Sequence, residues 1–130
     1  MFKLFLDDIR IPADVFTYIK NPIYLELDWV IVRNYDEFVK AIEERGVPDV
    51  VSFDHDLADE HYGLDDYVWN SEYDMFKEKT GYHCAQWLIY HCIDNKLMIS
   101  KKVYIHSMNP VGTKNIDSLF RTYEKIYRGT

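Results

Sequence analysis

The chain of 130 residues is poor in cysteine, glycine and proline, with two, five and four of them. Cys84 and Cys92 fall within one predicted helix, where a rise of 1.5 Å per residue separates them by about 12 Å. A disulfide needs α-carbons within about 7 Å, so we expect two buried thiols. The chain also lacks any apolar run near the roughly 20 residues that a membrane-spanning helix needs. Residues 1–3 run directly into a strand pattern, without the organisation of a signal peptide. We therefore expect a cytoplasmic globular protein with no membrane association.

Clustered basic residues are missing as well. The formal net charge is −7, whereas a groove for duplex nucleic acid needs gathered lysine and arginine side chains. Much of the excess lies in residues 58–80, which carry seven acidic residues and two lysines. A few basic groups could still hold one phosphate. The charge thus argues against a duplex-binding groove but leaves a nucleotide or a nucleic-acid end as a substrate.

Apolar runs that alternate with amphipathic stretches predict an α/β fold in a single domain, residues 1–130. Short apolar runs predict four strands, at residues 3–6, 29–32, 50–53 and 102–105. We expect helices over residues 14–20 and 35–45, a third marked by apolar residues from Ala85 to Ile93, and a last one marked by apolar residues from Ile116 to Tyr127. Asn34, with Glu37 three residues on, is typical of a helix cap. This alternation predicts a three-layer parallel sheet with helices on both faces, in which ligands bind beyond the carboxyl ends of the strands.

Residues 58–80 form an acidic aromatic insertion that is too long for a routine connection. Its aromatic residues are Tyr62, Tyr67, Trp69, Tyr73 and Phe76. Because the insertion begins directly after the polar segment that ends at Asp56, it could be a lid whose rings stack on a base. The other interpretation is a solvated insertion whose rings pack on the body of the protein.

Carboxylates follow two of the predicted strands. Asp7 and Asp8 come after the first strand and Asp54 after the third. Like charges gathered at one place are costly unless a metal, a proton or a basic group compensates them. Mg²⁺ takes one or two carboxylates and completes its shell with water and substrate phosphate. We therefore predict a Mg²⁺ site at Asp7, Asp8 and Asp54, although each aspartate alone could instead cap a helix or a turn.

Two histidines, His55 and His106, directly follow the third and fourth predicted strands. Histidine titrates near neutrality, so one ring can take a proton from water while the other protonates a leaving oxygen. Asp54 and Asp56 flank His55. The predicted catalytic residues are therefore His55, His106, Asp54 and Asp56. Asp56 could orient a histidine, bind the metal or cap the insertion. The alternative roles are structural: His55 tied to a flanking aspartate, and His106 a core residue at a strand end.

Basic and polar side chains near the same edge could hold a phosphate. The planar guanidinium of Arg10 suits this role, although it could simply pair with the neighbouring carboxylates. The stretch from Ser107 to Lys114 leads into the last helix, whose first N–H groups favour an anion. Ordinary capping by Thr113 or Asn115 is the alternative. The candidate phosphate-binding residues are Arg10, Ser107, Asn109, Gly112 and Lys114.

The order of the motifs resembles that of a known family. LFLDDIRIP is followed by SFDHDL, by TG before a helix, and by a strand that ends in HSMNPVGTKNI. Over essentially the whole chain this order is similar to that of the cyclic-phosphate processing receiver-like domains. The resemblance implies a receiver-like, flavodoxin-like sheet of four to five strands with an acidic pocket at the strand ends. By matching position, it implies a site made of Asp7, Asp8, Arg10, Asp54, His55, Asp56, His106, Ser107, Asn109 and Gly112.

The chain departs from an ordinary receiver in its strands and in its acidic motif. Four strands are visible where a receiver has five, and the lysine that should end the fifth strand is not found. Asp54 stands at the phosphoacceptor position, but His55 and Asp56 follow it, and a simple phosphoswitch does not need them.

The resemblance implies activity on cyclic phosphate ends of nucleic acid. The leading hypothesis is a phosphoesterase that opens or removes a cyclic phosphate on an RNA end or a nucleotide by histidine acid–base chemistry, with or without Mg²⁺. The second hypothesis is a non-catalytic receiver-like signalling or protein-interaction module with Asp54 as phosphoacceptor. The third is a metal-dependent phosphomonoesterase with Asp54 as nucleophile. The sequence leaves the oligomeric state open.

Overall fold

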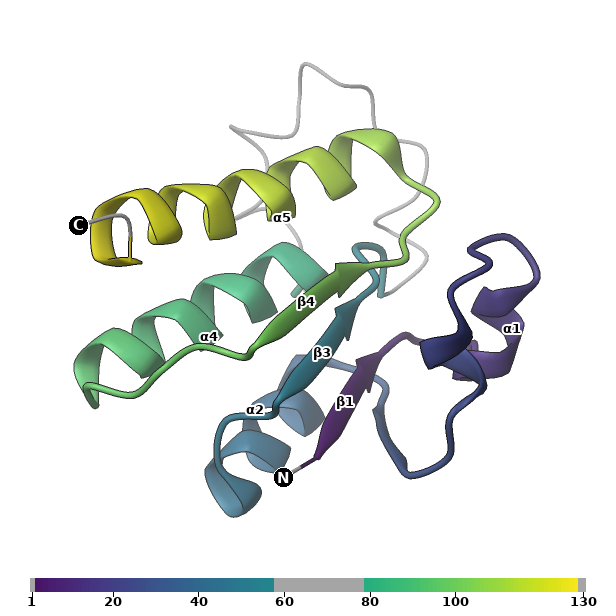
Figure 1. Ribbon diagram of the computed structural model, residues 1–130, viewed down its shortest axis with the longest axis horizontal. Helices are drawn as coiled ribbons and strands as arrows, with labels where there is room; N and C mark the ends of the chain where they lie inside the picture. The colour runs from purple at the N-terminus through teal and green to yellow at the C-terminus, as the bar shows by residue number, and fades with distance from the viewer. Residues whose placement is uncertain (1, 58–78, 129–130) are drawn as a thin grey trace.

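The structure, a computed structural model, describes residues 2–57 and 79–128 (Figure 1). It confirms the predicted α/β fold, because four parallel strands form one sheet in the order β2-β1-β3-β4. The strands are β1 (Lys3–Leu6), β2 (Trp29–Val32), β3 (Val50–Phe53) and β4 (Lys102–Ile105), each with the predicted bounds. The described residues contain no fifth strand, so β4 and β2 are the two edges of the sheet.

The strands end level with one another. Leu6 of β1 is paired with Phe53 of β3, which is paired in turn with Ile105 of β4. The residues that follow these positions therefore leave the sheet at the same edge. They are Asp7, Asp54 and His106.

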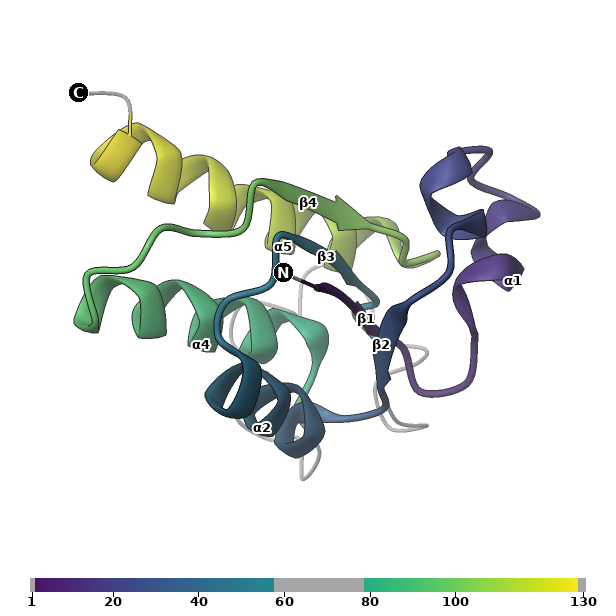
Figure 2. The same cartoon turned by 60° about the horizontal axis from the view of Figure 1, so that its bottom comes forward.

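Three helices cover one face of the sheet. They are α2 (Tyr35–Arg45), α4 (Gly81–Asp94) and α5 (Pro110–Tyr123), and α5 continues into a π-helical segment, η5 (Glu124–Arg128). α2 and α4 lie side by side under the sheet in Figure 2. The main core lies between these helices and the strands. Its fully buried members include Leu4, Leu6, Phe38, Val51, Phe53, Leu88 and Ile116.

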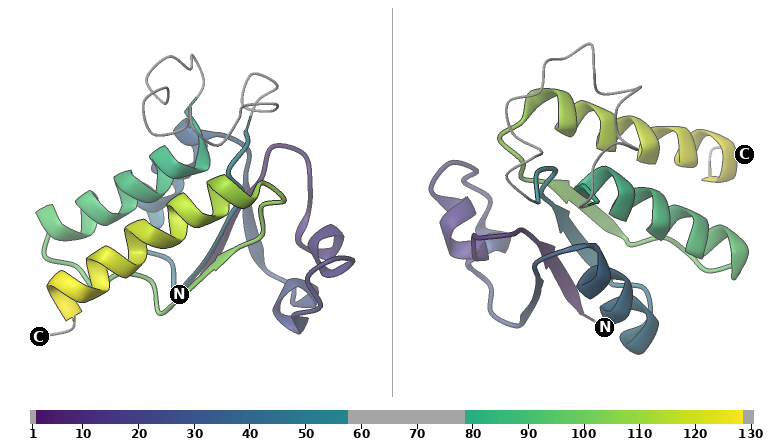
Figure 3. Two further views of the ribbon diagram at one scale, coloured as in Figure 1. Left: turned by 90° about the horizontal axis from the view of Figure 1, so that it is seen from above. Right: turned by 180° about the vertical axis from the view of Figure 1, so that it is seen from behind.

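The opposite face carries α1 (Pro12–Phe16) and a 3₁₀ helix, η1 (Pro22–Leu25). Figure 3 shows α1 on one side of the sheet and α4 and α5 on the other. A smaller core forms there around Phe5, Val15 and Tyr24. The prediction of helices on both faces is therefore confirmed, although the helical cover of this second face is short.

The helix predicted over residues 14–20 is wrong beyond Phe16. The Thr17 hydroxyl donates a hydrogen bond to the Asp14 carbonyl at 2.7 Å. This is the carbonyl that the Tyr18 amide would take in a continuing helix, and that amide turns to the Val15 carbonyl instead. A side-chain hydroxyl that competes for the backbone in this way ends a helix.

Helix caps were predicted correctly for α2 and wrongly for α5. The Asn34 side chain accepts from the Glu37 amide at 2.9 Å, as predicted. α5 begins at Pro110, earlier than predicted, because Asn109 is its cap and accepts from the Gly112 amide at 3.0 Å. Proline at the first helical position and asparagine before it are both favourable.

Cys84 and Cys92 are both buried free thiols, as predicted. In the described part of the chain no helix is long and apolar enough to cross a membrane. The predicted lid lies outside the described residues, apart from Lys79 and Thr80.

Candidate active site

Asp7 is held as a carboxylate at the end of β1, where its side chain is fully buried. Its Oδ1 accepts hydrogen bonds from the amides of Ile9 at 2.9 Å and Arg10 at 2.8 Å. Its Oδ2 lies 3.1 Å from His106 Nε2. Burial on its own would raise the pKa of Asp7, but the hydrogen bonds outweigh it and lower the pKa to about 2. Asp7 is therefore ionised at neutral pH.

Asp54, at the end of β3, differs from Asp7 in its protonation state. Its Oδ1 accepts from the His55 amide at 2.8 Å. Its Oδ2 is buried and has no hydrogen-bond partner in the described part of the chain. Burial first, and then the negative charges of Asp7, Asp56 and Asp8, raise the pKa of Asp54 to about 8. Without a compensating cation, Asp54 is mostly protonated at neutral pH.

Asp7, Asp8 and Asp54 come together as predicted. Each offers one carboxylate oxygen, and these oxygens all lie within 4.8 Å of one another. Asp8 is half-buried, and burial together with the charge of Asp7 raises its pKa. The donor set is all oxygen, as Mg²⁺ requires, and Asp54 Oδ2 gives a cation a ligand atom that no described residue hydrogen-bonds. The residues fit the predicted metal, and a bound ion stays a proposal.

His55 lies fully buried between Asp56 and the start of α5. Its Nδ1 is 2.8 Å from Asp56 Oδ1, and the side-chain nitrogen of Asn109, Nδ2, donates to the two oxygens of that carboxylate at 3.3 and 3.2 Å. A Cβ at Gly112 would collide with the His55 ring. Asp56 therefore orients the ring, one of the roles considered for it, and Gly112 makes room for the ring.

His106, directly after β4, is also fully buried, and both of its ring nitrogens have partners. Nε2 faces Asp7, and Nδ1 lies 2.6 Å from Ser52 Oγ. The ring stacks on Phe5, with centroids 4.5 Å apart. Burial lowers the pKa of His106, although Asp7 opposes this. The ring is therefore neutral at neutral pH and is locked in place.

Arg10 lies beside the acidic cluster and brings a positive charge to it. Its Nη1 is 3.5 Å from Asp7 Oδ2, and its side chain remains 33% exposed. The guanidinium also lies 5.5 Å from the centre of the Tyr18 ring. Arg33 fixes the loop below it, donating from Nη1 to the carbonyls of Asp7 at 3.1 Å and Arg10 at 2.6 Å. Arg10 thus forms the predicted salt bridge and still presents part of its side chain to solvent.

The loop between β4 and α5 uses most of its polar groups internally. Ser107 Oγ accepts from the Asn109 amide at 3.0 Å. Pro110 has no amide hydrogen and the Gly112 amide is capped by Asn109, so the start of the helix offers an anion fewer donors than predicted. Lys114 is exposed on the first turns of α5. Of this group, Lys114 remains the residue best placed to reach a ligand from solvent.

The family described as the cyclic-phosphate processing Receiver domain matches residues 2–122. The chain belongs to this family. The resemblance found in the motifs is thereby confirmed, and with it a receiver-like fold and an involvement of the family in cyclic-phosphate processing. Comparisons with curated proteins and with solved structures gave no match.

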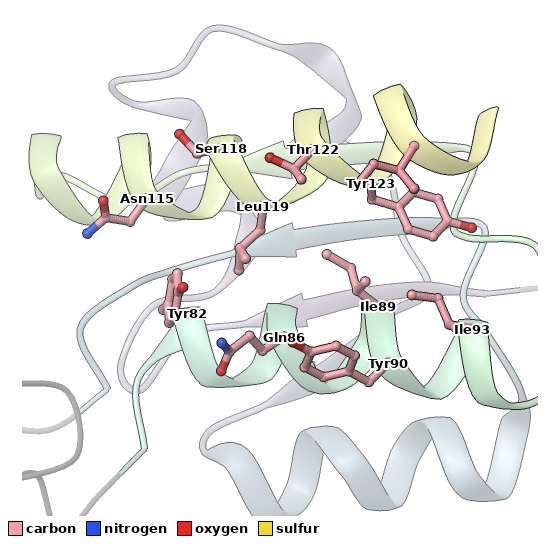
Figure 4. Close-up of a pocket in the computed structure, with 11 residues that line it drawn as sticks. Tyr82, Gln86, Ile89, Tyr90, Ile93, Asn115, Ser118, Leu119, Thr122 and Tyr123 are labelled. Atoms are coloured by element: carbon pink, nitrogen blue, oxygen red, sulfur yellow. The ribbon is translucent and has the colours of Figure 1, made fainter. Parts of the chain in front are cut away.

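This receiver-like domain also has an apolar groove of about 500 Å³ between α4 and α5 (Figure 4). Ile89 and Tyr90 of α4 face Leu119 and Tyr123 of α5 across it. None of the acidic residues of the cluster lines this groove. It is therefore separate from the candidate active site.

The sequence analysis missed four residues that shape the receiver-like site. Tyr24 and Ser52 continue the hydrogen bonds of His106, Tyr18 donates to its carbonyl, and Arg33 pins the loop after β1. Only Ser52 gave a signal in the sequence, as a polar residue within the apolar run Val50–Phe53.

Proposed function

We propose that this domain is a phosphoesterase that hydrolyses cyclic phosphates on RNA ends or nucleotides. The observation that carries the proposal is the convergence of Asp7, Asp8 and Asp54, with Asp54 Oδ2 buried and without a hydrogen-bond partner among residues 2–57 and 79–128. Such a cluster is costly without a compensating cation, and Mg²⁺ with a phosphate ligand would compensate it. The family's description supports a cyclic phosphate as that ligand.

In this proposal Asp7, Asp8 and Asp54 would hold Mg²⁺. When bound, the ion would supply neutralisation of the charge that develops on the phosphate oxygens. Arg10 would contact a non-bridging phosphate oxygen with the exposed part of its guanidinium. Lys114 would add positive charge from α5.

The reaction adds water across one phosphorus–oxygen bond. The water oxygen bonds to phosphorus, the bond to one ribose oxygen breaks, and a phosphate monoester and a free hydroxyl result. We assign the base to His55, because Asp56 Oδ1 lies 2.8 Å from its Nδ1 and orients the ring. The leaving oxygen would take its proton from solvent. Direct proton transfer by His106 stays a prediction, since both of its nitrogens are engaged and the geometry favours support of Asp7.

The test is turnover of 2′,3′-cyclic nucleotides and of RNA with a cyclic phosphate end, in Mg²⁺ or in chelator. Asp54→Asn and chelator should each abolish turnover, and His55→Gln should reduce it by about 10²–10⁴-fold, the usual range for a general base. Asp94→Asn is the matched control, because it makes the same change at an exposed position at the end of α4. Turnover that survives in chelator would overturn the metal assignment.

A second candidate is a receiver-like module that is phosphorylated on Asp54 and does not act on cyclic phosphates. The position of Asp54 at the end of β3, beside Asp7 and Asp8, favours it. This candidate expects no turnover of any cyclic phosphate, and a phosphoryl group on Asp54 after incubation with acetyl phosphate. Mass spectrometry of wild type and Asp54→Asn separates the two candidates.

A further inference from the structure

A continuous chain of buried hydrogen bonds runs behind the acidic cluster. The Tyr24 hydroxyl lies 2.8 Å from Ser52 Oγ, which lies 2.6 Å from His106 Nδ1. His106 Nε2 lies 3.1 Å from Asp7 Oδ2. Tyr24 is 2% exposed and the other three side chains are fully buried. This series of hydrogen bonds links η1, on one face of the sheet, to the Asp7 carboxylate at the end of β1.

The direction of these hydrogen bonds follows from Asp7. Its Oδ1 already accepts from two backbone amides, and an ionised carboxylate can only accept. His106 Nε2 must therefore carry the hydrogen that points at Asp7. A neutral imidazole has one N–H, so Nδ1 is left as an acceptor. The Ser52 hydroxyl then donates to Nδ1, and the Tyr24 hydroxyl donates to Ser52.

We propose that Tyr24 and Ser52 are positioning residues that act on Asp7 through His106. Every donor in this series of hydrogen bonds has one acceptor, and the last bond fixes Asp7 Oδ2, the oxygen that the backbone amides of Ile9 and Arg10 do not hold. The stack on Phe5 holds the His106 ring, and the hydrogen bond of 2.8 Å that Tyr18 donates to the His106 carbonyl holds its backbone. Outer partners of this kind set the tautomer and orientation of the residues that face a ligand.

The surroundings of Ser52 distinguish this role from simple packing. Its neighbours in β3, Val51 and Phe53, are buried and apolar, and Phe5 and Trp29 pack on the same side of the sheet as the chain. A buried hydroxyl stabilises a fold only when its hydrogen bonds are made, so an apolar side chain would serve packing equally well. The hydroxyls of Ser52 and Tyr24 are needed where the orientation of Asp7 matters.

Two matched pairs of variants test the proposal. Ser52→Thr keeps the hydroxyl and Ser52→Val has nearly the same shape without it. Tyr24→Phe removes the hydroxyl at the far end of the chain. Tyr104→Phe is its control. Tyr104 belongs to β4 and packs in the same small core, but its hydroxyl is not a member of the hydrogen-bond series from Tyr24 to Asp7. Urea unfolding reports whether each variant is folded.

The first readout needs neither metal nor activity. Nitrogen-15 NMR of the full chain should show His106 with its hydrogen on Nε2. Ser52→Val and Tyr24→Phe should shift the His106 Nδ1 signal and the Asp7 carboxyl carbon signal, whereas Ser52→Thr and Tyr104→Phe should leave both near wild type. A hydrogen on Nδ1 in the wild type would overturn the proposal.

The second readout rests on the proposed function. The dissociation constant for Mn²⁺ should rise about 10-fold in Ser52→Val, at the low end for loss of an outer partner, and Ser52→Thr should restore it. Equal constants in the two Ser52 variants would refute a positioning role. A wild type that binds no Mn²⁺ and turns over no cyclic phosphate would refute the proposed function, and the NMR comparison would still decide the role of Ser52. If Ser52→Thr does not fold, Tyr24→Phe against Tyr104→Phe gives the same decision.

Discussion

The substitution Asp54→Asn should make the metal-free protein more stable at neutral and alkaline pH. The folded protein binds a proton at Asp54 up to a pKa of about 8, whereas an unfolded chain releases it near pH 4. Between these values the folded state binds more protons than the unfolded state. The free energy of unfolding of the wild type therefore falls as the pH rises from about 4 to about 8. Asparagine keeps the shape of the protonated acid and removes this dependence.

The size of the effect follows from the difference between the pKa of Asp54 in the folded protein and its pKa in the unfolded chain. One pKa unit corresponds to about 1.4 kcal/mol, so the wild type loses about 1–2 kcal/mol by pH 5 and about 4–5 kcal/mol by pH 8. The asparagine Oδ1 can still accept from the His55 amide, as Asp54 Oδ1 does at 2.8 Å. Its Nδ2 can donate to a neighbouring carboxylate. We therefore expect Asp54→Asn to exceed the wild type in stability by about 3 kcal/mol more at pH 8 than at pH 5.

Urea unfolding followed by tryptophan fluorescence measures this difference. Wild type, Asp54→Asn and the exposed control Asp94→Asn are compared at pH 5 and pH 8, each in chelator and in Mg²⁺. The control should stay within about 0.5 kcal/mol of the wild type at both pH values. Mg²⁺ should stabilise the wild type and the control but not Asp54→Asn. An advantage of Asp54→Asn that is the same at pH 5 and pH 8, or absent at pH 8, would refute the assignment of a buried protonated acid.

Three further outcomes follow from the site. Mg²⁺ binding at pH 7 should release about one proton per ion, because the pKa of Asp54 is raised to about 8, and calorimetry in buffers of different ionisation enthalpy counts the released protons. Asp7→Asn should lower the free energy of unfolding by about 2 kcal/mol at pH 7, measured in urea. The contribution of Asp7 to stability depends on pH in the opposite sense from that of Asp54. The pKa of Asp7 is lowered to about 2, so its stabilisation is present above about pH 4 and lost toward pH 2. Gly112→Ala should cost about 1–3 kcal/mol in the same assay, because its Cβ meets the His55 ring.

The sheet and the meeting of the acidic residues could be predicted from the sequence because both depend on local patterns. Each strand is a short apolar run with polar residues after it, as at Leu6–Asp7 and Phe53–Asp54. Parallel strands of equal register bring their carboxyl ends to one edge, so the residues after these strands had to lie together.

The charge states of the site could not be predicted from the sequence. Asp7 and Asp54 each follow a buried strand and look alike in the sequence. They differ because Asp7 accepts hydrogen bonds from two backbone amides and lies against His106, whereas Asp54 accepts, from the described residues, only the bond from the His55 amide. The bond from His106 joins residues that are far apart in the chain, and only the fold shows which carboxylate it reaches. For the same reason, the sequence could not decide whether His55 and His106 are buried.

The energetics of Asp54 argue that the cluster is a binding site and not a by-product of the fold. Holding this side chain buried and protonated costs about 4 kcal/mol at neutral pH, a large share of the 5–15 kcal/mol that stabilises a typical domain. Asparagine would fill the same space without that cost, so packing does not explain the acid. A cation bound to the ionised form of Asp54 would recover the loss, because Asp7 is already ionised beside it and Asp8 lies within ligand distance. Of the roles open to Asp54, metal binding is therefore the one that turns its unfavourable position into a gain.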